Sequence, residues 1–510
     1  MRICSVDVGT TGTKAIIFDE QGRILSMAFR EYPVICPKVG WAEQDAGKVF
    51  DIILELMGSC ICNAGIRELD AVSLSVQGDA VIPVDEDGKA LCSAILGMDN
   101  RSAPQAGWCD QEMGAYHIFS KTGMRPHPIN SATKIMWIQQ ERKEIARQTY
   151  KYLTYDGYLV RRMGADGYVT DMTMASRTML CGHLSGDWDR QMLSVCGIDR
   201  SVLPDIIPSG SVAGRMLRQT ARQLCLRNQP FLVIGGHDQT CAGVGAGAVV
   251  PGVAVDSHGT AEVLSAGFRI PILSEEMCDG FYPCYHHGVK GQYFTFALNH
   301  CGGIVFRWYR DCFSEEEKRR AGAEGRKAYD VMVEEMEDTP SGLLFLPHLN
   351  GSGTPYCDIS ARGSILGLTL STTRAEVGKA LLEGLSYEIR LNAERFRDMG
   401  IRADDIRCVG GGASHDRTVQ LKADVLGQPV STMKNREAAS LGAAILALNG
   451  LGYFKTVEEG VSCLVKTDRV YYPQKEKADI YSARFGLYRQ TYHALEPIYR
   501  YWNKGMVRSL

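Results

Sequence analysis

The sequence predicts an α/β fold divided between two domains, and three observations support this prediction. The chain has 510 residues, more than one hydrophobic core usually organises. Short apolar stretches typical of strands alternate with stretches typical of helices, as expected where helices cover a sheet. A strand–turn–strand pattern at the N-terminus also recurs near the middle of the chain, which indicates a duplicated plan.

The composition limits the class of function. The chain is 45% hydrophobic and 23% charged, as is typical of globular proteins. Its net charge of -3 argues against a broad basic surface for nucleic acid. We find no signal peptide and no apolar run of roughly 18 residues that would predict a membrane span. The 17 cysteines lack the paired C-x-x-C spacing of a structural zinc site and suit a reducing compartment. We therefore expect a cytoplasmic protein that acts on a small molecule.

The first half begins with an expected antiparallel meander. Three apolar runs predict its strands, at Ile3–Val6, Ala15–Phe18 and Ile24–Met27. Further strands are expected at Ala71–Val76 and Phe231–Ile234, and helices at Ala46–Met57 and Lys134–Ile145. This alternation is the α/β pattern.

The second half repeats the opening plan. Gly252–Gly267 contains a strand, an Asp, a Gly-Thr turn and a second strand, in the order found at the N-terminus. We place the boundary in the Gly- and Ala-rich run 242–252. The expected domains are residues 1–248 and 249–470, followed by a helical segment at 471–510.

Later helices carry start signals and an aromatic stripe. Ser314 with Glu317 and Thr373 with Glu376 match the capping-box pattern. Four aromatic residues at helical spacing predict a terminal helix that docks onto the body, and these are Tyr481, Phe485, Tyr488 and Tyr492.

The first candidate site is the segment Asp7–Lys14 (DVGTTGTK), directly after an expected strand. Its glycines allow a tight turn that exposes backbone N–H groups, while its threonines and lysine can meet phosphate oxygens. Asp7 could hold hydrated Mg²⁺, which prefers oxygen ligands. An ordinary hairpin turn is an equal alternative for this segment alone.

The second candidate is Asp238, which follows a strand and two glycines. A carboxylate there can accept a hydroxyl proton as a general base, which contributes roughly 10²–10⁴ in rate. Capping of the next helix explains it equally well. The nearby glycines of Gly243–Gly247 are better explained by close helix packing than by a dinucleotide fingerprint.

The third candidate is Val409–Asp416 (VGGGASHD), between a strand and a helix. Its glycines allow a nucleotide to approach the backbone, and the helix N-terminus favours anions. A flexible loop is the alternative.

Together these segments resemble the FGGY family of carbohydrate kinases along nearly the whole chain. The other matching segments are Gly40–Asp45 (GWAEQD), Thr170–Asp171, Ala175–Thr178 (ASRT), Gly186–Asp189 (GDWD), Thr354–Tyr356 (TPY), Ala361–Gly363 (ARG), Gly367–Thr369 (GLT), Glu383–Gly384 and Glu437–Ala444 (EAASLGAA). The ordered set is far more specific than any one match.

The resemblance implies two ribonuclease-H-like domains of the actin and hexokinase type, with a cleft between them. The first would hold the sugar and the second ATP. Asp7 would organise Mg²⁺, and Asp238 would be the catalytic base. The implied nucleotide contacts are Thr10, Thr11, Lys14, Thr260, Gly303, Gly411 and Gly412. The implied sugar contacts are Gln77, Asp79, Asp99, Arg101, Asp238 and Gln239.

The implied reaction is in-line transfer of the γ-phosphoryl group of MgATP to a terminal hydroxyl. Homodimers are common in the family, so a homodimer is a further expectation. One rival is a non-catalytic sensor of sugar and nucleotide, against which Asp7 and Asp238 argue. Another is an ATPase coupled to a protein partner, against which the sugar-loop segments argue.

The substrate is less well defined. Xylulokinases usually carry Gly-Gln-Met-His-Gly and glycerol kinases Gln-Arg-Glu where this chain has Val76–Ala80 (VQGDA). Gly97 also replaces a tryptophan common before the Asp-x-Arg segment. We expect a pentulose, as in xylulokinases, with glycerol, erythritol and gluconate as alternatives.

Overall fold

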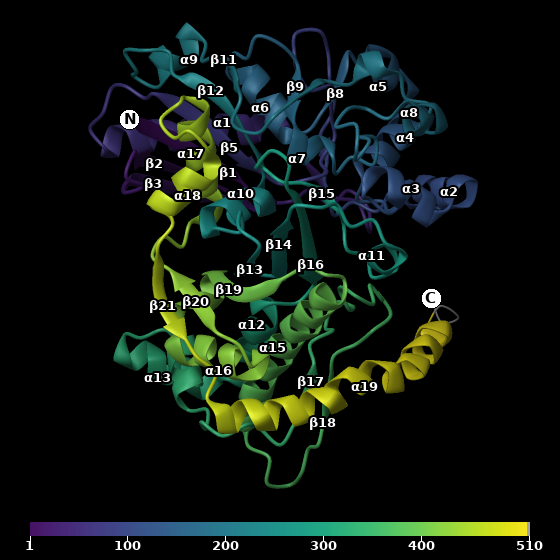
Figure 1. Cartoon of the computed structure of the whole chain (residues 1–510), viewed down its shortest axis with the longest axis vertical. Helices are drawn as coiled ribbons and strands as arrows, with labels where there is room; N and C mark the ends of the chain where they lie inside the picture. Colours follow the sequence, from purple (N-terminus) through teal and green to yellow (C-terminus); the bar gives the residue numbers. More distant parts are fainter. Residues whose placement is uncertain (507–510) are drawn as a thin grey trace.

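The structure is a computed structural model that describes residues 1–506, and it contains two large β-sheets in two lobes (Figure 1). The six-stranded sheet has the order β11 (Val212–Arg215), β12 (Phe231–His237), β5 (Ala71–Val76), β1 (Arg2–Val8), β2 (Gly12–Asp19) and β3 (Ile24–Glu31). The seven-stranded sheet has the order β15 (Tyr285–His286), β16 (Tyr293–Asn299), β14 (Glu262–Phe268), β13 (Gly252–His258), β19 (Ala403–Gly410), β20 (Val430–Met433) and β21 (Thr467–Tyr471).

Smaller elements surround these sheets. Two-stranded sheets pair β4 (Glu43–Gln44) with β7 (Ala94–Ile95), β6 (Ile82–Val84) with β8 (Lys151–Leu153), β9 (Val169–Asp171) with β10 (Asp205–Ile207), and β17 (Leu344–Leu346) with β18 (Ser364–Leu366). The helices of the first lobe are α1 (Ala46–Asn63), α2 (Ala103–Met113), α3 (Ala115–Thr122), α4 (Ser131–Glu141), α5 (Lys143–Gln148), α6 (Tyr155–Met163), α7 (Met172–Ala175), α8 (Arg190–Cys196) and α9 (Arg218–Gln223). The later helices are α10 (Asp238–Ala246), α11 (Glu275–Asp279), α12 (Gly303–Phe313), α13 (Glu315–Glu324), α14 (Ala328–Glu334), α15 (Arg374–Asp398), α16 (Asp416–Leu426), α17 (Ala438–Gly450), α18 (Val457–Leu464) and α19 (Lys475–Met506).

The first three strands form the expected antiparallel meander. β1 pairs with β2, so that Asp7 lies opposite Lys14, and β2 pairs with β3. β5 pairs in parallel with both β1 and β12. The second sheet follows the same plan, since β13 pairs antiparallel with β14 and parallel with β19. The duplicated plan expected from the repeat is therefore confirmed.

The expected helix Lys134–Ile145 is wrong in its bounds and its continuity. Its residues belong to α4 and α5, which are separated at Arg142, whose φ of -129° and ψ of 52° lie outside the helical region. α5 has no buried residue among its six. The charged run 141–144 spans the junction, and only Ile145 and Ala146 of α5 pack, partly buried, against the apolar core.

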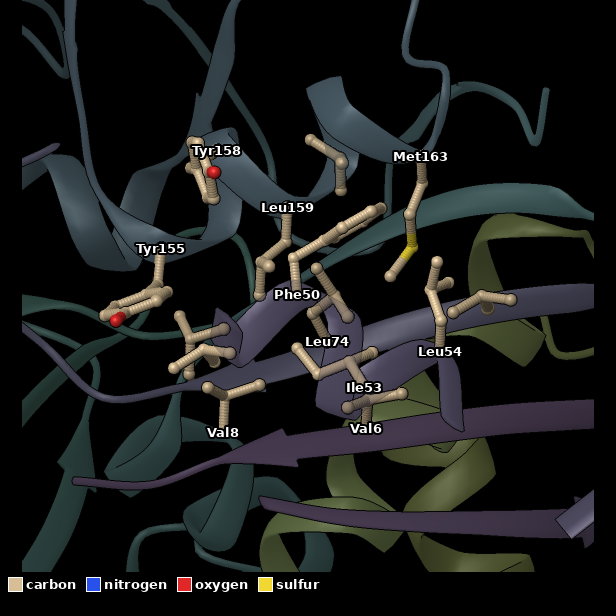
Figure 2. Packing of buried hydrophobic residues seen from close by; sticks show 14 of the residues in the cluster. Val6, Val8, Phe50, Ile53, Leu54, Leu74, Tyr155, Tyr158, Leu159 and Met163 are labelled. Atoms are coloured by element: carbon tan, nitrogen blue, oxygen red, sulfur yellow. The ribbon is translucent and has the colours of Figure 1, made fainter. Parts of the chain in front are cut away.

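One face of the six-stranded sheet packs against α1 and α6. Figure 2 shows this core, in which strand residues Val6, Val8 and Leu74 meet Phe50, Ile53 and Leu54 of α1 and Tyr155, Tyr158, Leu159 and Met163 of α6. Each fully buried apolar side chain contributes roughly 1.5–3 kcal/mol to stability. This core holds the central strands rigidly.

Two helices form the layer between the sheets. α10 contacts β12, β13 and β14, while α17 contacts β1, β5 and β12. α17 follows β20 in the chain, yet it lies in the first lobe beside α10 (Figure 1). A Cβ at Gly245 would lie 1.8 Å from the carbonyl oxygen of Ala438, and one at Gly442 would lie 1.8 Å from that of Cys241. The helix-packing interpretation of the glycine run is confirmed.

The helix starts of the second lobe match the predictions in part. Thr373 accepts a hydrogen bond from the backbone N–H of Glu376 at 3.2 Å and so caps α15, but the Glu376 carboxylate accepts from the N–H of Gly342 at 3.0 Å, so only half of the expected capping box forms. Ser314 precedes α13, but its hydroxyl donates to the carbonyl of Tyr309 at 3.5 Å, and the expected capping box is wrong. Glu317 is buried and pairs with Arg374 at 2.7 Å, which explains why its carboxylate does not reach back to the helix start.

The terminal helix α19 docks as its aromatic stripe predicts. Its side chains Tyr481, Phe485, Tyr488 and Tyr492 are all buried. The Tyr488 ring lies 4.9 Å from that of Tyr387 on α15. No helix within residues 1–506 has both the length and the apolar character needed to cross a membrane.

We expect Gly245→Ala to lower the free energy of unfolding by about 3 kcal/mol or more. The new methyl group would overlap the backbone of α17, and overpacking costs roughly 1–3 kcal/mol even where side chains can adjust. Chemical denaturation measures the loss. Gly107→Ala is the control, because a Cβ at Gly107 on α2 has no neighbour within 4 Å. That variant should equal the wild type or exceed it by up to about 1 kcal/mol, and equal stability of the two variants would contradict close packing of α10 on α17.

Candidate active site

The strand register brings three candidate residues to one edge of the six-stranded sheet. Val8 of β1 and His237 of β12 both lie opposite Val76 of β5. These strands are parallel, so their carboxyl ends share an edge. Asp7 is the penultimate residue of its strand, while Gln77 and Asp238 directly follow theirs. Residues separated by up to 231 positions therefore meet at this edge.

Asp7 is a partly buried carboxylate at this edge. Its Oδ1 accepts a hydrogen bond from the Ser75 hydroxyl at 2.7 Å. Burial raises the pKa of Asp7 to about 6, and the nearby charges of Asp238 and Glu437 add to this, whereas Ser75 and Lys14 oppose it. The interaction with Asp238 shows that the two candidate carboxylates lie within electrostatic reach of each other.

The first phosphate-loop candidates have different surroundings. Lys14 forms an ion pair with Glu437, the residue before α17. Thr11 is exposed at the turn between β1 and β2. Thr10 donates its hydroxyl to the Gln77 side-chain oxygen at 3.1 Å.

Gln77 stabilises the turn that carries Thr10 through hydrogen bonds. Its amide nitrogen donates to the Gln44 side chain at 2.9 Å and to the Gly9 carbonyl at 3.4 Å. Gln44 in turn accepts a hydrogen bond from the Tyr155 hydroxyl at 2.8 Å and donates to the carbonyl of Thr10. The amide of Gln77 is thus engaged within the protein, which fixes the loop.

Asp238 begins α10 and is 32% exposed. Its Oδ1 lies 2.9 Å from His237 Nε2 and accepts a hydrogen bond from the backbone N–H of Gln239 at 2.7 Å. Burial raises the pKa of Asp238, but His237 and Arg177 outweigh burial and hold the pKa below its ordinary value. Asp238 is therefore ionised at neutral pH and able to accept a proton.

Asp79 lies beside an arginine that the sequence interpretation did not assign to the site. It is buried in the left-handed region, with a φ of 68°. Its Oδ2 pairs with Arg177, whose guanidinium lies 5.1 Å from the Tyr285 ring and 5.2 Å from the Phe296 ring. Oδ1 of Asp79, Nε and Nη1 of Arg177 and Oε1 of Gln239 are buried without a hydrogen-bond partner among the described residues. Buried polar atoms are normally satisfied, so this set is suited to a polar ligand.

Asp99 and Arg101 satisfy each other. The Asp99 carboxylate accepts from the backbone N–H and both Nε and Nη2 of Arg101, and from the N–H of Ala42. Arg101 also pairs with Glu43 at 2.8 Å and lies 3.8 Å from the Trp41 ring. The structure gives both charged groups several protein partners.

The nucleotide candidates of the second lobe meet at the edge of its sheet. His258 of β13 lies opposite Gly410 of β19. The Gly303 N–H donates to the Gly259 carbonyl at 2.9 Å, which joins the start of α12 to the turn that carries Thr260. Thr260 is exposed.

The glycine loop after β19 packs on His258. A Cβ at Gly412 would lie 2.2 Å from the His258 ring, while Gly411 is exposed with no atom within 4 Å of such a Cβ. His258 Nδ1 lies 2.7 Å from the carboxylate of Glu262, which also pairs with buried Lys422. This edge brings together the four nucleotide candidates Thr260, Gly303, Gly411 and Gly412. The buried pair of Glu262 and Lys422 holds His258, on which the glycine loop packs.

Sequence reasoning missed several charged or titratable neighbours. Arg177 belonged to a recognised segment, and His237 directly precedes Asp238, so local signals existed for both. Buried Lys134 donates to the Asp79 carbonyl at 3.2 Å, and burial lowers its pKa to about 8. Glu437 pairs with Lys14 across 423 positions. Only tertiary structure reveals these last two contacts.

The residues at the first edge fit a magnesium ion that is held mainly through water. Mg²⁺ is usually held by one or two carboxylates together with waters and substrate phosphates, and Asp7 supplies one partly buried carboxylate. No group of three His, Cys, Asp or Glu residues within residues 1–506 could hold a metal ion directly. One partly buried carboxylate suits Mg²⁺ that keeps most of its waters.

Comparison with known families accounts for this arrangement. The model of the N-terminal domain of the FGGY family of carbohydrate kinases matches residues 2–245, and that of its C-terminal domain matches residues 257–451. The chain belongs to the FGGY family of carbohydrate kinases. It is a kinase with the two-domain fold of the actin and hexokinase type, as predicted.

Similar proteins have names that refer to different substrates. The chain is 26% identical to xylulose kinase of Bacillus subtilis over 96% of both chains, and 30% identical to glycerol kinase of Deinococcus radiodurans over 94% of both. Its structure matches the crystal structure of gluconate kinase from Lactobacillus acidophilus with a TM-score of 0.89, at 27% identity, over 98% of this chain and 99% of that one. These similarities establish a carbohydrate kinase and do not decide its substrate.

We expect ligand-free Asp7→Asn protein to be more stable than the wild type at pH 8, by up to about 3 kcal/mol. The folded-state pKa of about 6 lies above the ordinary value, so ionised Asp7 opposes folding at high pH, at about 1.4 kcal/mol per pKa unit. The difference should fall as the pH drops through 6 and vanish below about 4, where both states are protonated. Thermal unfolding at several pH values checks this. Exposed Asp51→Asn on α1 should show no such trend, and an Asp7→Asn gain that is independent of pH would refute the electrostatic cause.

We expect Arg101→Met to destabilise the protein by roughly 3–5 kcal/mol, because it leaves Asp99 as an unpaired buried charge. The surface pair of Arg147 and Glu144 provides the control. Arg147→Met should cost at most about 1 kcal/mol. Chemical denaturation of both variants decides the matter, and a small loss for Arg101→Met would argue that the pair contributes mainly to ligand binding.

Proposed function

We propose that this carbohydrate kinase transfers the γ-phosphoryl group of ATP to a terminal hydroxyl of a small sugar or polyol, with a pentulose as its preferred substrate. The observation that carries the proposal is the convergence of Asp7 and Asp238 at one sheet edge. One carboxylate is available for the metal and the other for the hydroxyl proton. This division is what phosphoryl transfer to an alcohol requires.

Asp238 acts as the general base in this proposal. Its lowered pKa keeps it ionised, and its partial exposure leaves it accessible to a substrate hydroxyl. It accepts the hydroxyl proton as the oxygen attacks phosphorus, and Gln239 helps to orient the substrate. Asp7 would organise hydrated Mg²⁺, which supplies charge neutralisation on the phosphates.

The nucleotide is assigned to the glycine-rich turns. Thr10, Thr11 and Lys14 would contact the phosphates from the first lobe. Thr260, Gly303, Gly411 and Gly412 would contact the nucleotide from the second, where the start of α12 favours anions. In this proposal residues 1–248 bind mainly sugar and residues 249–470 mainly ATP. The predicted helical segment 471–510, of which 507–510 lie outside the described residues, would pack on the body. Closure of the two parts would exclude water.

The buried polar atoms of Asp79, Arg177 and Gln239 that have no hydrogen-bond partner among the described residues support a neutral substrate rich in hydroxyl groups. Asp79 and Gln239 offer acceptors, while Arg177 offers donors, and sugar hydroxyls can satisfy both. Because Asp79 and Arg177 form an ion pair, their charges cancel. This balance favours a pentulose over gluconate, while glycerol and erythritol remain alternatives. Gln77, Asp99 and Arg101 would then shape the sugar site through the network that holds its loops.

The cellular setting belongs to the same proposal. The cysteines are free thiols, which supports a reducing cytoplasm. The family resemblance suggests a homodimer. The net charge of -3 argues against nucleic acid as a partner, and no membrane partner is expected. A non-catalytic sensor is the second candidate. An ionised Asp238 close to buried polar atoms that lack hydrogen-bond partners among the described residues argues against it.

A coupled assay of ADP release over a panel of ketopentoses, polyols and sugar acids tests the proposal. We expect strong stimulation by a ketopentose and weak ATP hydrolysis without sugar. Asp238→Asn should lower kcat by at least about 10²-fold, with nucleotide binding and thermal stability unchanged. Gln490→Glu, on an exposed part of α19, is the control and should keep wild-type kcat. ADP release that no compound of the panel stimulates would refute the proposed acceptor, and a folded, fully active Asp238→Asn would refute the role of Asp238 as the base.

A further inference from the structure

His237 is a buried imidazole in direct contact with the proposed base. Its side chain is 5% exposed, against 32% for Asp238. Nε2 lies 2.9 Å from Oδ1 of Asp238, and Nδ1 lies 3.4 Å from the Tyr285 hydroxyl. If the Tyr285 O–H donates to Nδ1, the neutral ring carries its proton on Nε2 and donates it to Asp238. Each ring nitrogen then has one partner.

The contact distinguishes the two oxygens of Asp238. Oδ1 lies against Nε2 of His237 and accepts a hydrogen bond from the backbone N–H of Gln239. Oδ2 has no protein partner within the described part of the chain. A carboxylate held through one oxygen presents the other in a fixed direction. This is the geometry that a general base needs.

The backbone of His237 is fixed independently of its ring. Its N–H donates to the Thr173 hydroxyl at 2.8 Å, and that hydroxyl donates to the Asp171 carboxylate at 2.6 Å. Asp171 is fully buried and also accepts from the N–H of Met174. Hydrogen bonds through Thr173 and Asp171 therefore connect the junction between β12 and α10 to the start of α7.

Gly78 provides the space that the imidazole occupies. A Cβ at this position would lie 2.8 Å from the His237 ring and 2.9 Å from Nε of Arg177. The sugar loop of this chain has glycine where the xylulokinase and glycerol kinase patterns have larger residues. The absence of a side chain at Gly78 thus leaves room for both the His237 ring and the Arg177 guanidinium to pack against this loop.

We propose that His237 is a positioning residue for the phosphoryl-transfer reaction: its Nε2–H holds Oδ1 of Asp238 so that Oδ2 faces the substrate hydroxyl. This inference rests on the proposed function, because it assigns the proton-accepting role to Asp238. It adds a residue that acts through the base and is not needed for sugar or nucleotide binding. Gly78 makes the contact sterically possible.

The test compares two substitutions at His237. His237→Phe keeps a planar ring but removes the donor, whereas His237→Gln keeps an amide donor near Nε2. We expect His237→Phe to lower kcat roughly 10- to 100-fold, a part of the general-base contribution, with KM for sugar and ATP and thermal stability little changed. His237→Gln should recover most of the loss. Tyr285→Phe, which removes only the Nδ1 partner, should lower kcat less than His237→Phe.

A pH profile separates positioning from packing. His237 helps to keep Asp238 ionised, so its removal should move the acidic limb of kcat to higher pH. The other titratable groups around Asp238 are Asp7, Arg177, Tyr285 and Cys241, and none of them is altered in His237→Phe or His237→Gln. Wild-type kcat with an unmoved acidic limb in His237→Phe would overturn the proposal. Equal losses of kcat in His237→Phe and His237→Gln, together with a large drop in thermal stability, would also overturn it.

A direct titration keeps this inference separate from the proposed function. Carbon-13 NMR of labelled aspartate, with Asp238→Asn used to assign the signal, follows the Asp238 carboxyl in ligand-free protein. Its titration should shift to higher pH in His237→Phe whichever sugar the enzyme uses. If the titration shifts but no sugar stimulates ADP release, the proposed function fails while the contact stands. If the titration is unchanged, His237 does not position Asp238.

Discussion

The close contact between α10 and α17 is the constraint on which the rest of the structure depends. Gly245 and Gly442 allow the two helix backbones to touch, without side chains between them. α10 also packs on strands of both sheets, so its position relates one lobe to the other. Because Asp238 is its first residue, the same helix that joins the lobes also carries the proposed base. A change in how α10 packs on α17 would therefore move the Asp238 carboxylate as well as the two lobes.

The two carboxylates at the sheet edge are tuned in opposite directions by their surroundings. Burial dominates at Asp7 and raises its pKa, which makes the ionised form unfavourable until a cation is near. At Asp238 the adjacent imidazole and guanidinium outweigh burial and stabilise the ionised form. Pairs of titratable groups whose environments separate their pKa values are typical of sites with divided acid–base roles. The environments thus agree with a metal role for one and a base role for the other.

Much of the fold could be predicted because its signals are local. The strand bounds near Ala71–Val76, the meander and the terminal aromatic stripe follow from patterns within a few residues. The glycine loops were located for the same reason. Contacts between distant segments could not be predicted, and examples are the Lys14–Glu437 pair and the packing of α17 on the first sheet. Short-range rules also failed where a long-range partner competed, as when Glu317 pairs with Arg374 and leaves Ser314 without its capping box.

The position of α17 has a consequence for how the protein is made. The first sheet is encoded before residue 240, but the helix that covers one of its faces ends at Gly450. During synthesis, Ile16, Phe18 and Val233 would therefore lack their final neighbours until most of the polypeptide has left the ribosome. Such a delay leaves an apolar surface open to chaperones or to aggregation. The nascent N-terminal half can fold its α1 side early, whereas completion of its other side awaits a segment more than 200 residues away.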